Sequence, residues 1–266
     1  MSQPLPISQS DLESLLGDTF LQSVIHYAET DSTNSQAIEL LASNTAVELP
    51  CLLYTESQVA GRGRGANPWW SAGGSLTFSL IVDFSETTFS VEQKPLLPLL
   101  TGMAVARVGE TLLPDAEFTI KWPNDVYLAG RKLAGVLIEV PSSKSSARAV
   151  IGVGLNVNNS FAEAPEDLAS TGISLADHSG TQYDRMEILT AFVREFESLI
   201  KSFTTSKSFL DDWRGYCLLT GKQVTLQTGA TEVQGSCCGV DEAGALVLET
   251  SGGRQSFFGG VVRSWT

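Results

Sequence analysis

Residues 56–70, ESQVAGRGRGANPWW, combine two arginines with three glycines directly before a pair of tryptophans. Gly61, Gly63 and Gly65 let the backbone approach a ligand closely and turn N–H groups toward an anion. Arg62 and Arg64 supply forked donors suited to a carboxylate or a phosphate. The stretch therefore predicts an anion-binding loop that closes over its ligand; a mobile surface loop and an RNA contact of the Arg-Gly type are the alternatives that the motif alone leaves open. It is not a P-loop, because no Lys-Ser or Lys-Thr pair follows the last glycine.

A second stretch, KWPNDVYLAGRKLAGVLIE at 121–139, has a lysine on each side of a tight turn. Asn124 and Asp125 add an amide and a carboxylate at its tip, and Gly135 lets the next strand pass close to another group. An ordinary hairpin explains the turn residues themselves. It does not explain Lys121 and Lys132 on either side of them, which favours a ligand-binding interpretation.

A third stretch, IGVGLNVN at 151–158, has glycines at 152 and 154 within a strand pattern. Such glycines weaken a sheet unless a ligand or another backbone comes near. Asn156 is then placed to hydrogen-bond that ligand. By itself this stretch is a weak signal.

Short strands and a few helices must position these residues. Residues 31–43, 96–113 and 184–206 predict helices from their caps and apolar stripes. CLLYTES and residues 75–84 predict buried strands on either side of the glycine loop. EFTIKW, VYL, RKLAGVLIEV and RAVIGVGLNV predict further strands separated by turns, which indicates a mixed or antiparallel sheet rather than a regular βαβ alternation.

After WRGYCLLTG the pattern changes to short strands alone, which predicts a small β-barrel of about fifty residues. We place the boundary near Leu219, so residues 1–218 are expected to form one domain and residues 219–266 a second one. Adjacent Cys237 and Cys238 should point to opposite faces of a sheet.

Composition narrows the classes of function. The chain has 266 residues, is 42% hydrophobic and carries 30 acidic against 17 basic residues, a formal net charge of −13. That charge argues against general nucleic-acid binding, so an anion site must be local. No apolar run approaches the roughly 20 residues that cross a bilayer, and no signal-peptide pattern begins the chain, which predicts a cytoplasmic protein. The four cysteines and two histidines show no zinc-ligand spacing and no triad pattern.

Taken together and in this order, four segments resemble the biotin protein ligase family, which includes the holocarboxylase synthetases. The matching blocks are DSTN at 31–34, Q-x-AGRGR at 58–64 with Trp69, KWPND with RKLAGVL, and GVGLNVN. The resemblance extends from Asp31 to Trp265. It implies an α+β fold, with a mixed β-sheet catalytic domain flanked by helices, of the class II synthetase-like biotin/lipoate ligase type, and a small C-terminal SH3-like β-barrel.

The resemblance also implies a reaction and its residues. ATP would activate biotin as biotinyl-5′-AMP, and the biotinyl group would pass to a lysine of the biotin carboxyl carrier protein of acetyl-CoA carboxylase. Arg64 and Lys132 would be catalytic, and Asp125 would hold Mg²⁺. The residues implied for biotin are Ser32, Thr33, Asn34, Gln58, Arg62, Gly63, Arg64, Lys132 and Gly135. The residues implied for ATP are Arg64, Trp69, Lys121, Asn124, Asp125 and Asn156.

Two alternative functions remain to be weighed against a biotin protein ligase. One is a lipoate–protein ligase, which shares the fold and the adenylation chemistry, and the other is a non-catalytic biotin-sensing regulator. Asn67 stands where many bacterial members have a later arginine, so the loop is more similar to that of eukaryotic-type ligases. The 30 residues before Asp31 are too few for an operator-binding winged helix, so we expect a monofunctional chain without a nucleic-acid partner. The sequence leaves open whether the chain forms a homodimer, and whether Trp69 stacks on adenine or anchors the loop.

Overall fold

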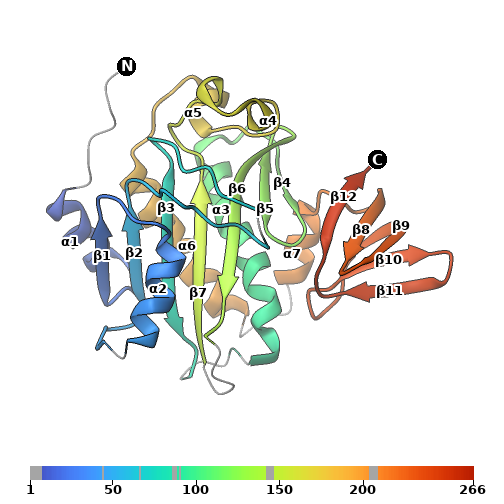
Figure 1. The fold of residues 1–266 in the computed structure, drawn as a ribbon, viewed down its shortest axis with the longest axis horizontal. Helices are drawn as coiled ribbons and strands as arrows, with labels where there is room; N and C mark the ends of the chain where they lie inside the picture. Colours follow the sequence, from blue (N-terminus) through green and yellow to red (C-terminus); the bar gives the residue numbers. More distant parts are fainter. Residues whose placement is uncertain are drawn as a thin grey trace.

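The computed structural model describes residues 8–43, 45–65, 67–85, 89, 91–141, 147–203 and 209–266. Figure 1 shows a large sheet between helices and a separate small β domain at the C-terminal end of the chain. The strand order is β1-β2-β3-β7-β6-β5-β4 in the large sheet and β11-β10-β9-β8-β12 in the small one. The predicted α+β architecture is confirmed.

The large sheet is mixed, as predicted. Its strands are β1 (Ser23–Tyr27), β2 (Cys51–Thr55), β3 (Leu76–Asp83), β4 (Phe118–Lys121), β5 (Asp125–Leu128), β6 (Arg131–Glu139) and β7 (Arg148–Leu155). Strands β1 and β2 pair in parallel, whereas the other neighbours pair antiparallel. The central strands β2, β3 and β7 are buried almost throughout, because helices cover both faces of the sheet.

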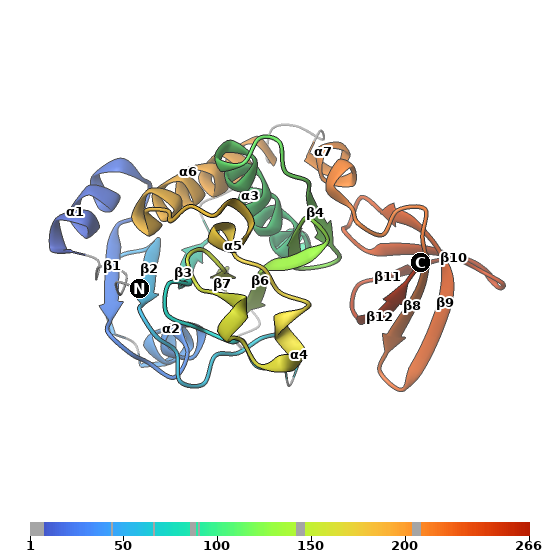
Figure 2. The same ribbon diagram turned by 90° about the horizontal axis from the view of Figure 1, so that it is seen from above.

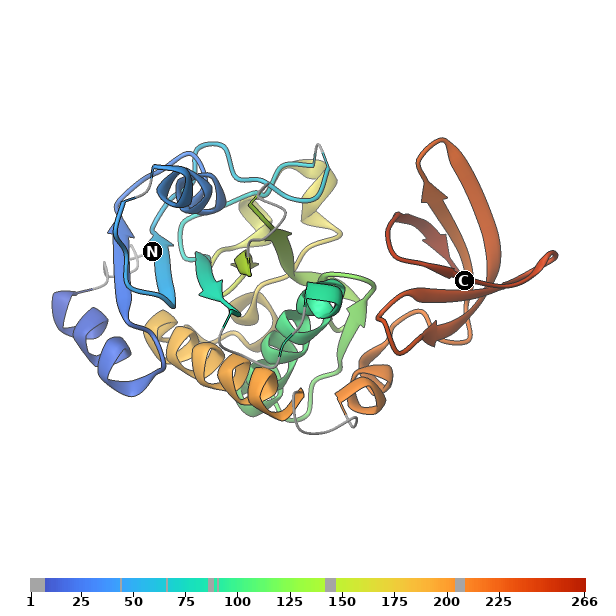
Figure 3. The same ribbon diagram turned by 90° about the horizontal axis from the view of Figure 1, so that it is seen from below.

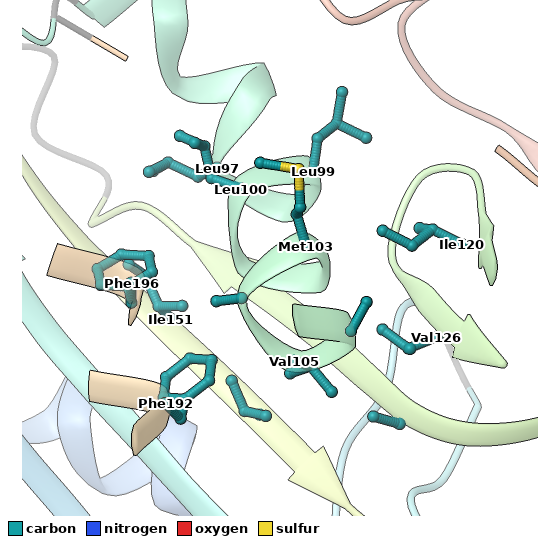
Figure 4. Close-up of a cluster of buried hydrophobic side chains, with 14 of the residues drawn as sticks. Leu97, Leu99, Leu100, Met103, Val105, Ile120, Val126, Ile151, Phe192 and Phe196 are labelled. Carbon is teal, nitrogen blue, oxygen red and sulfur yellow. The ribbon is translucent and has the colours of Figure 1, made fainter. Parts of the chain in front are cut away.

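Helices cover both faces of the large sheet. α2 (Thr33–Ala42) lies on one face, and α3 (Leu97–Leu112) and α6 (Arg185–Phe203) pack on the other (Figure 2). In α6, Leu189, Phe192, Val193 and Phe196 recur at helical spacing and are buried. Figure 4 shows Phe192 and Phe196 in the cluster of buried side chains with Ile151 of β7. All three predicted helices are confirmed, with ends shifted by one or two residues, and positions 204–206, predicted to end the third helix, lie outside the described residues.

The sequence did not predict several short elements. These are α1 (Gln9–Asp18), α4 (Glu166–Ala169), α5 (Leu175–Ser179), α7 (Phe209–Tyr216), strand β1 and the 3₁₀ turns Val91–Leu96 and Phe161–Glu163. Elements this short have little periodicity to read, and packing decides them. In α7, for example, the helix is held by the fully buried Trp213.

The small domain comprises β8 (Gln223–Thr228), β9 (Thr231–Val240), β10 (Leu246–Thr250), β11 (Gly253–Phe257) and β12 (Val261–Trp265). Its ladders are antiparallel. In the part of the chain that the structure describes, no ladder joins β11 to β12, so the predicted barrel is an open sheet. Cys237 is buried and Cys238 exposed, as the alternation predicts.

The small domain lies beyond α7 on the β4–β5 side of the large sheet (Figures 1 and 3), and a hydrogen bond joins it to the turn that follows β4. The buried indole N–H of Trp122 donates to the carbonyl of Gly244 at 3.0 Å. The backbone N–H of Leu218 donates to the carbonyl of Ile120 at 2.9 Å. These bonds bring the C-terminal strands beside the KWPND segment. None of the described helices is long and apolar enough to cross a membrane.

Candidate active site

A cavity of about 540 Å³ lies where the glycine loop, the first turn of α2, strands β6 and β7 and the small domain meet. Almost every residue predicted for ligand binding lines it. The predicted residues in its wall are Ser32, Thr33, Asn34, Gln58, Arg62, Gly63, Arg64, Trp69, Lys121, Asn124, Asp125, Lys132 and Gly135. Residues as far apart in the sequence as Ser32 and Gly135 are therefore assembled into one site.

Asn156 is the predicted site residue that the structure places elsewhere. It is 3% exposed and does not line the cavity. Its Oδ1 accepts from Asn159 Nδ2 at 3.1 Å, and its carbonyl accepts from the backbone N–H of Leu175. The side chain therefore fixes the turn after β7, and the nucleotide contact expected of it has no support in this geometry.

The wall of the cavity is strongly basic although the chain is acidic. Arg62, Arg64, Lys121, Lys132 and Arg263 line it, against the single acidic side chain of Asp125. A concave surface with one sign of charge focuses the field on its interior. The cavity therefore has the local excess of positive charge that an anion site would need on an acidic chain.

Ser32 and Thr33, at the start of α2, line the cavity together with Gln58. Ser32 occupies the N-cap position but its side chain makes no capping bond. The backbone N–H and hydroxyl of Thr33 donate to Gln58 Oε1 at 2.8 and 3.3 Å. Because Gln58 Oε1 faces these donors, the amide nitrogen faces away, and among the described residues it has no partner. This nitrogen is available as a donor to a ligand.

Asn34 serves the framework as well as the cavity wall. Its Nδ2 donates to the carbonyl of Leu137 at 3.2 Å and to Glu139 Oε2 at 2.9 Å, and its Oδ1 accepts from Ser79 at 2.6 Å. A Cβ at Gly152 would lie 2.1 Å from Asn34 Oδ1. Gly152 thus leaves room for the Asn34 side chain. The sequence predicted instead that a ligand or another backbone approaches this glycine.

The glycine loop is folded back on itself. The N–H of Gly63 donates to the carbonyl of Asn67, and the N–H of Trp69 donates to the carbonyl of Gly61, both at 2.8 Å. A Cβ at Gly61 would lie 2.4 Å from the Trp69 carbonyl, so glycine permits the close approach. Since Gly63 N–H is already paired, an anion contact through it requires the loop to rearrange.

Trp69 lies flat against two paired glycines of the sheet. Gly135 and Gly154 are register partners, and a Cβ on them would lie 3.4 and 2.2 Å from the Trp69 ring. The indole N–H is buried and has no partner among the described residues. The ring anchors the loop on β6 and β7.

We expect Gly154→Ala to disable this anchor. The new methyl group overlaps the Trp69 ring, and a central strand cannot shift, so the ring must leave and the loop with it. The free energy of unfolding should fall by about 1–3 kcal/mol, as in other overpacked sites, and ligand-dependent protection of the loop from protease should be lost. Urea denaturation and limited digestion measure both.

Gly73→Ala is the matched control, because a Cβ there meets nothing within 4 Å and the residue lies on the same loop. Wild-type stability in Gly154→Ala would show that the ring is not held against the sheet.

The KWPND segment forms a compact charge cluster. Asp125 Oδ1 and Lys132 Nζ form an ion pair at 2.7 Å. Lys121 Nζ lies 4.5 Å from the centre of the Trp265 ring of the small domain. Burial lowers the pKa of Lys121, opposed by the nearby Asp125 carboxylate. Asn124 Nδ2 donates to the carbonyl of Val136, which orients Asn124 Oδ1 toward the glycine loop.

Arg64 connects the loop to both domains. Its Nη1 donates to Asn124 Oδ1 and its Nη2 to the carbonyl of Gly260, each at 3.2 Å. Burial lowers the pKa of the guanidinium, opposed by Asp125. Although the glycines on either side offer Arg64 no side-chain packing, the small domain supplies it with a hydrogen-bond partner.

Two groups of residues were missed. The small domain contributes Gln227, Gly229, Gly260, Val261, Val262 and Arg263 to the wall. Glu139 holds Arg62 through a pair of hydrogen bonds. No local pattern marks either group, because both depend on contacts between distant segments.

Comparisons with known proteins give the site its context. A family model described as "Biotin/lipoate A/B protein ligase family" matches residues 27–156, and one described as "Biotin protein ligase C terminal domain" matches residues 219–263. A biotin–[acetyl-CoA-carboxylase] ligase of Mycobacterium tuberculosis is 34% identical, over 85% of this chain and 82% of its own. The chain belongs to the biotin protein ligase family.

Other members of the biotin protein ligase family are similar along their whole length. The biotin–[acetyl-CoA-carboxylase] ligase of Paracoccus denitrificans is 30% identical, over 88% of this chain and 99% of its own. The structure of the biotin protein ligase from Aquifex aeolicus, in complex with biotin and ATP, superposes with a TM-score of 0.77 at 28% identity, over 92% of this chain and 99% of that one. The predicted family and fold are confirmed.

Proposed function

We propose that this chain is an ATP-dependent biotin protein ligase that forms biotinyl-5′-AMP and transfers the biotinyl group to a lysine of a biotin carboxyl carrier domain, with that of acetyl-CoA carboxylase as the expected acceptor. The observation that supports this most is the single cavity in which the DSTN, GRGRG and KWPND segments meet. Five cationic side chains face it and one carboxylate. A site of this charge suits two anionic reactants, a carboxylate and a nucleoside triphosphate.

In the first step a biotin carboxylate oxygen bonds to the α-phosphorus of ATP, and pyrophosphate leaves. Two anions must approach, so the step needs fixed positive charge. Lys132, held at Asp125, and Arg64, held at Asn124, are already oriented in the cavity wall. Held in this way, they lose little freedom when the reactants bind, which is how positioning accelerates such a reaction.

In the second step the carrier lysine amine attacks the acyl carbon, and AMP leaves with the bonding electrons. The intermediate is a mixed anhydride that water would hydrolyse. In the cavity wall, Arg64 of the glycine loop donates a hydrogen bond to the carbonyl of Gly260 in the small domain. We assign the loop and the small domain the exclusion of water from the intermediate.

The residues present fit Mg²⁺ only in part. Asp125 is the one carboxylate in the wall, it is already paired with Lys132, and the described residues contain no cluster of three or more metal-ligating side chains. Mg²⁺ in such sites takes one or two protein carboxylates and the phosphates of its substrate. Asp125 would therefore supply one ligand, and the metal, when bound, would neutralise phosphate charge.

Pyrophosphate release tests the first step and separates the candidates. We expect release with biotin and ATP together, and none when lipoate replaces biotin or when either substrate is missing. Equal release with lipoate would identify a lipoate–protein ligase. No release with either acid would favour a non-catalytic biotin-sensing protein.

We expect no nucleic-acid partner, because the net charge of −13 repels a phosphate backbone. The chain should not retard DNA in a gel at physiological salt, with or without biotin and ATP. A specific, competitor-resistant shift would contradict this. We place this ATP-dependent activity in the cytoplasm.

A further inference from the structure

Glu139, the last residue of β6, joins two segments of the cavity wall without lining the cavity itself. Its Oε1 accepts from Arg62 Nη2 at 2.7 Å, and its Oε2 accepts from Arg62 Nη1 at 3.2 Å. The same Oε2 accepts from Asn34 Nδ2 at 2.9 Å. We infer that Glu139 is a positioning residue that holds the glycine loop against the first turn of α2 and so shapes the biotin side of the cavity. The inference rests on the proposed function for its ligand.

On the loop side, the arginine is committed to this cluster. Besides the two bonds to Glu139, Arg62 Nη1 donates to Ser35 Oγ at 3.1 Å. Both terminal nitrogens of the guanidinium are therefore used within the cluster. The contribution of Arg62 to ligand binding is then to place the loop backbone, and its two-point pairing with a carboxylate fixes direction as well as distance.

On the helix side, the carboxylate sets the direction of a hydrogen-bond chain. An ionised carboxylate only accepts, so Asn34 must turn its Nδ2 toward Glu139 and its Oδ1 toward Ser79, which donates to it at 2.6 Å. Asn34 follows Thr33, whose N–H donates to Gln58 Oε1. Glu139 thus helps to fix the helix turn that orients the side chain of Gln58 in the cavity wall.

The Arg62–Glu139 pair is partly exposed, so it should contribute little to the stability of the domain. The Arg62 side chain is 45% exposed and that of Glu139 is 25% exposed. Ion pairs at such exposure contribute little to global stability. Loss of this pair should therefore loosen the loop while leaving the domain folded.

The ion pair between Asp83 and Arg148 is a matched control. It is 2.9 Å long, and its side chains are 27% and 48% exposed, close to the values for Glu139 and Arg62. It joins β3 to β7 in register, and neither residue lines the cavity. Asp83→Asn removes a comparable charge pair from the same sheet, away from the loop.

The test begins with limited trypsin digestion in the absence of biotin, with mass spectrometry of cleavage after Arg62 and Arg64. We expect Glu139→Gln, which replaces an acceptor of the cluster by an amide donor, to raise this cleavage rate about tenfold. Asp83→Asn should digest like the wild type. This readout needs neither substrate, so it stands apart from the proposed function.

Adenylation kinetics supply the second measurement. In Glu139→Gln the KM for biotin should rise about tenfold, with kcat and the KM for ATP within about twofold of wild type, because the lost interaction orders the biotin side alone. Arg62→Gln should give the same pattern and also serves if Glu139→Gln does not fold. The KM for biotin of the double variant should not exceed the higher of the two single-variant values, since both changes remove the same interaction.

A wild-type cleavage rate in Glu139→Gln, together with a wild-type KM for biotin in Glu139→Gln and Arg62→Gln, would overturn the inference. So would an equal loosening of the loop in Asp83→Asn, which would show a general effect of removing charge from the sheet. If the wild type releases no pyrophosphate with biotin, the proposed function fails, and the digestion still decides whether Glu139 holds the loop.

Discussion

Lys132→Ala is expected to lower the single-turnover rate of biotinyl-5′-AMP formation by about a hundredfold to a thousandfold, the usual cost of removing one preorganised charge donor from a reacting centre. Lys132 lies in the cavity wall, held at 2.7 Å from Asp125, so its charge is in place before the reactants meet. The affinity for biotin should change by less than about threefold, because the interaction strengthens as the phosphate and carboxylate approach. Quenched-flow detection of the adenylate measures the rate.

This variant also leaves the Asp125 carboxylate without its lysine beside the phosphates. The double variant Asp125→Asn/Lys132→Ala separates the two effects, and we expect it to remain as slow as the single one. Lys201→Ala removes a lysine that pairs with Glu197 on the surface of α6 and should be normal. Near-normal adenylation in Lys132→Ala would remove this lysine from the mechanism.

Arg64→Gly should release biotinyl-5′-AMP about tenfold to a hundredfold faster than the wild type. Each terminal nitrogen of Arg64 keeps a second N–H beyond its bond to Asn124 or Gly260, and a charged contact of these groups with the intermediate would contribute about 1.5–3 kcal/mol. Freed adenylate acylates any amine, so the variant should biotinylate bystander proteins in a mixed lysate, whereas the wild type should label its carrier. A streptavidin blot after incubation with biotin and ATP shows the pattern. Loss of the bonds to Asn124 and Gly260 should also lower the free energy of unfolding by about 1 kcal/mol.

Arg64→Ala is the companion variant, because it removes the guanidinium without creating three consecutive glycines at 63–65. Equal leakage from both variants assigns the effect to the guanidinium, and leakage from Arg64→Gly alone assigns it to backbone freedom. If both variants label only the carrier at full intensity, Arg64 does not retain the intermediate.

The sequence was most informative where chemistry or periodicity is local. The spacing of the apolar residues Leu189, Phe192 and Phe196 predicted α6, because the same face of a helix recurs about every 3.6 residues. The glycines and arginines of 61–65 predicted an anion site because their types are costly or unusual without one. The structure brings these residues into one wall.

What the sequence could not show depends on contacts between distant segments. Arg64 meets Gly260 across 196 positions, and nothing near either residue announces the pairing. Glu139 looks like an ordinary polar strand end until Arg62 and Asn34 are beside it. Gly154 signalled a close approach correctly, but the approaching group is the Trp69 ring. Asn156 shows the opposite case, because the side chain that was predicted to bind a nucleotide instead accepts a hydrogen bond from Asn159.

Transfer of biotin to an isolated carrier domain tests the central proposal most directly. The chain should be incubated with biotin, ATP and Mg²⁺ and the biotin carboxyl carrier domain of acetyl-CoA carboxylase, and the intact mass of that domain measured. We predict the addition of one biotinyl group on a single lysine, abolished when ATP is omitted or when that lysine is changed to arginine, and not reproduced with lipoate. An unmodified carrier domain under these conditions, or equal modification with lipoate, would contradict the assignment of this chain as a biotin protein ligase.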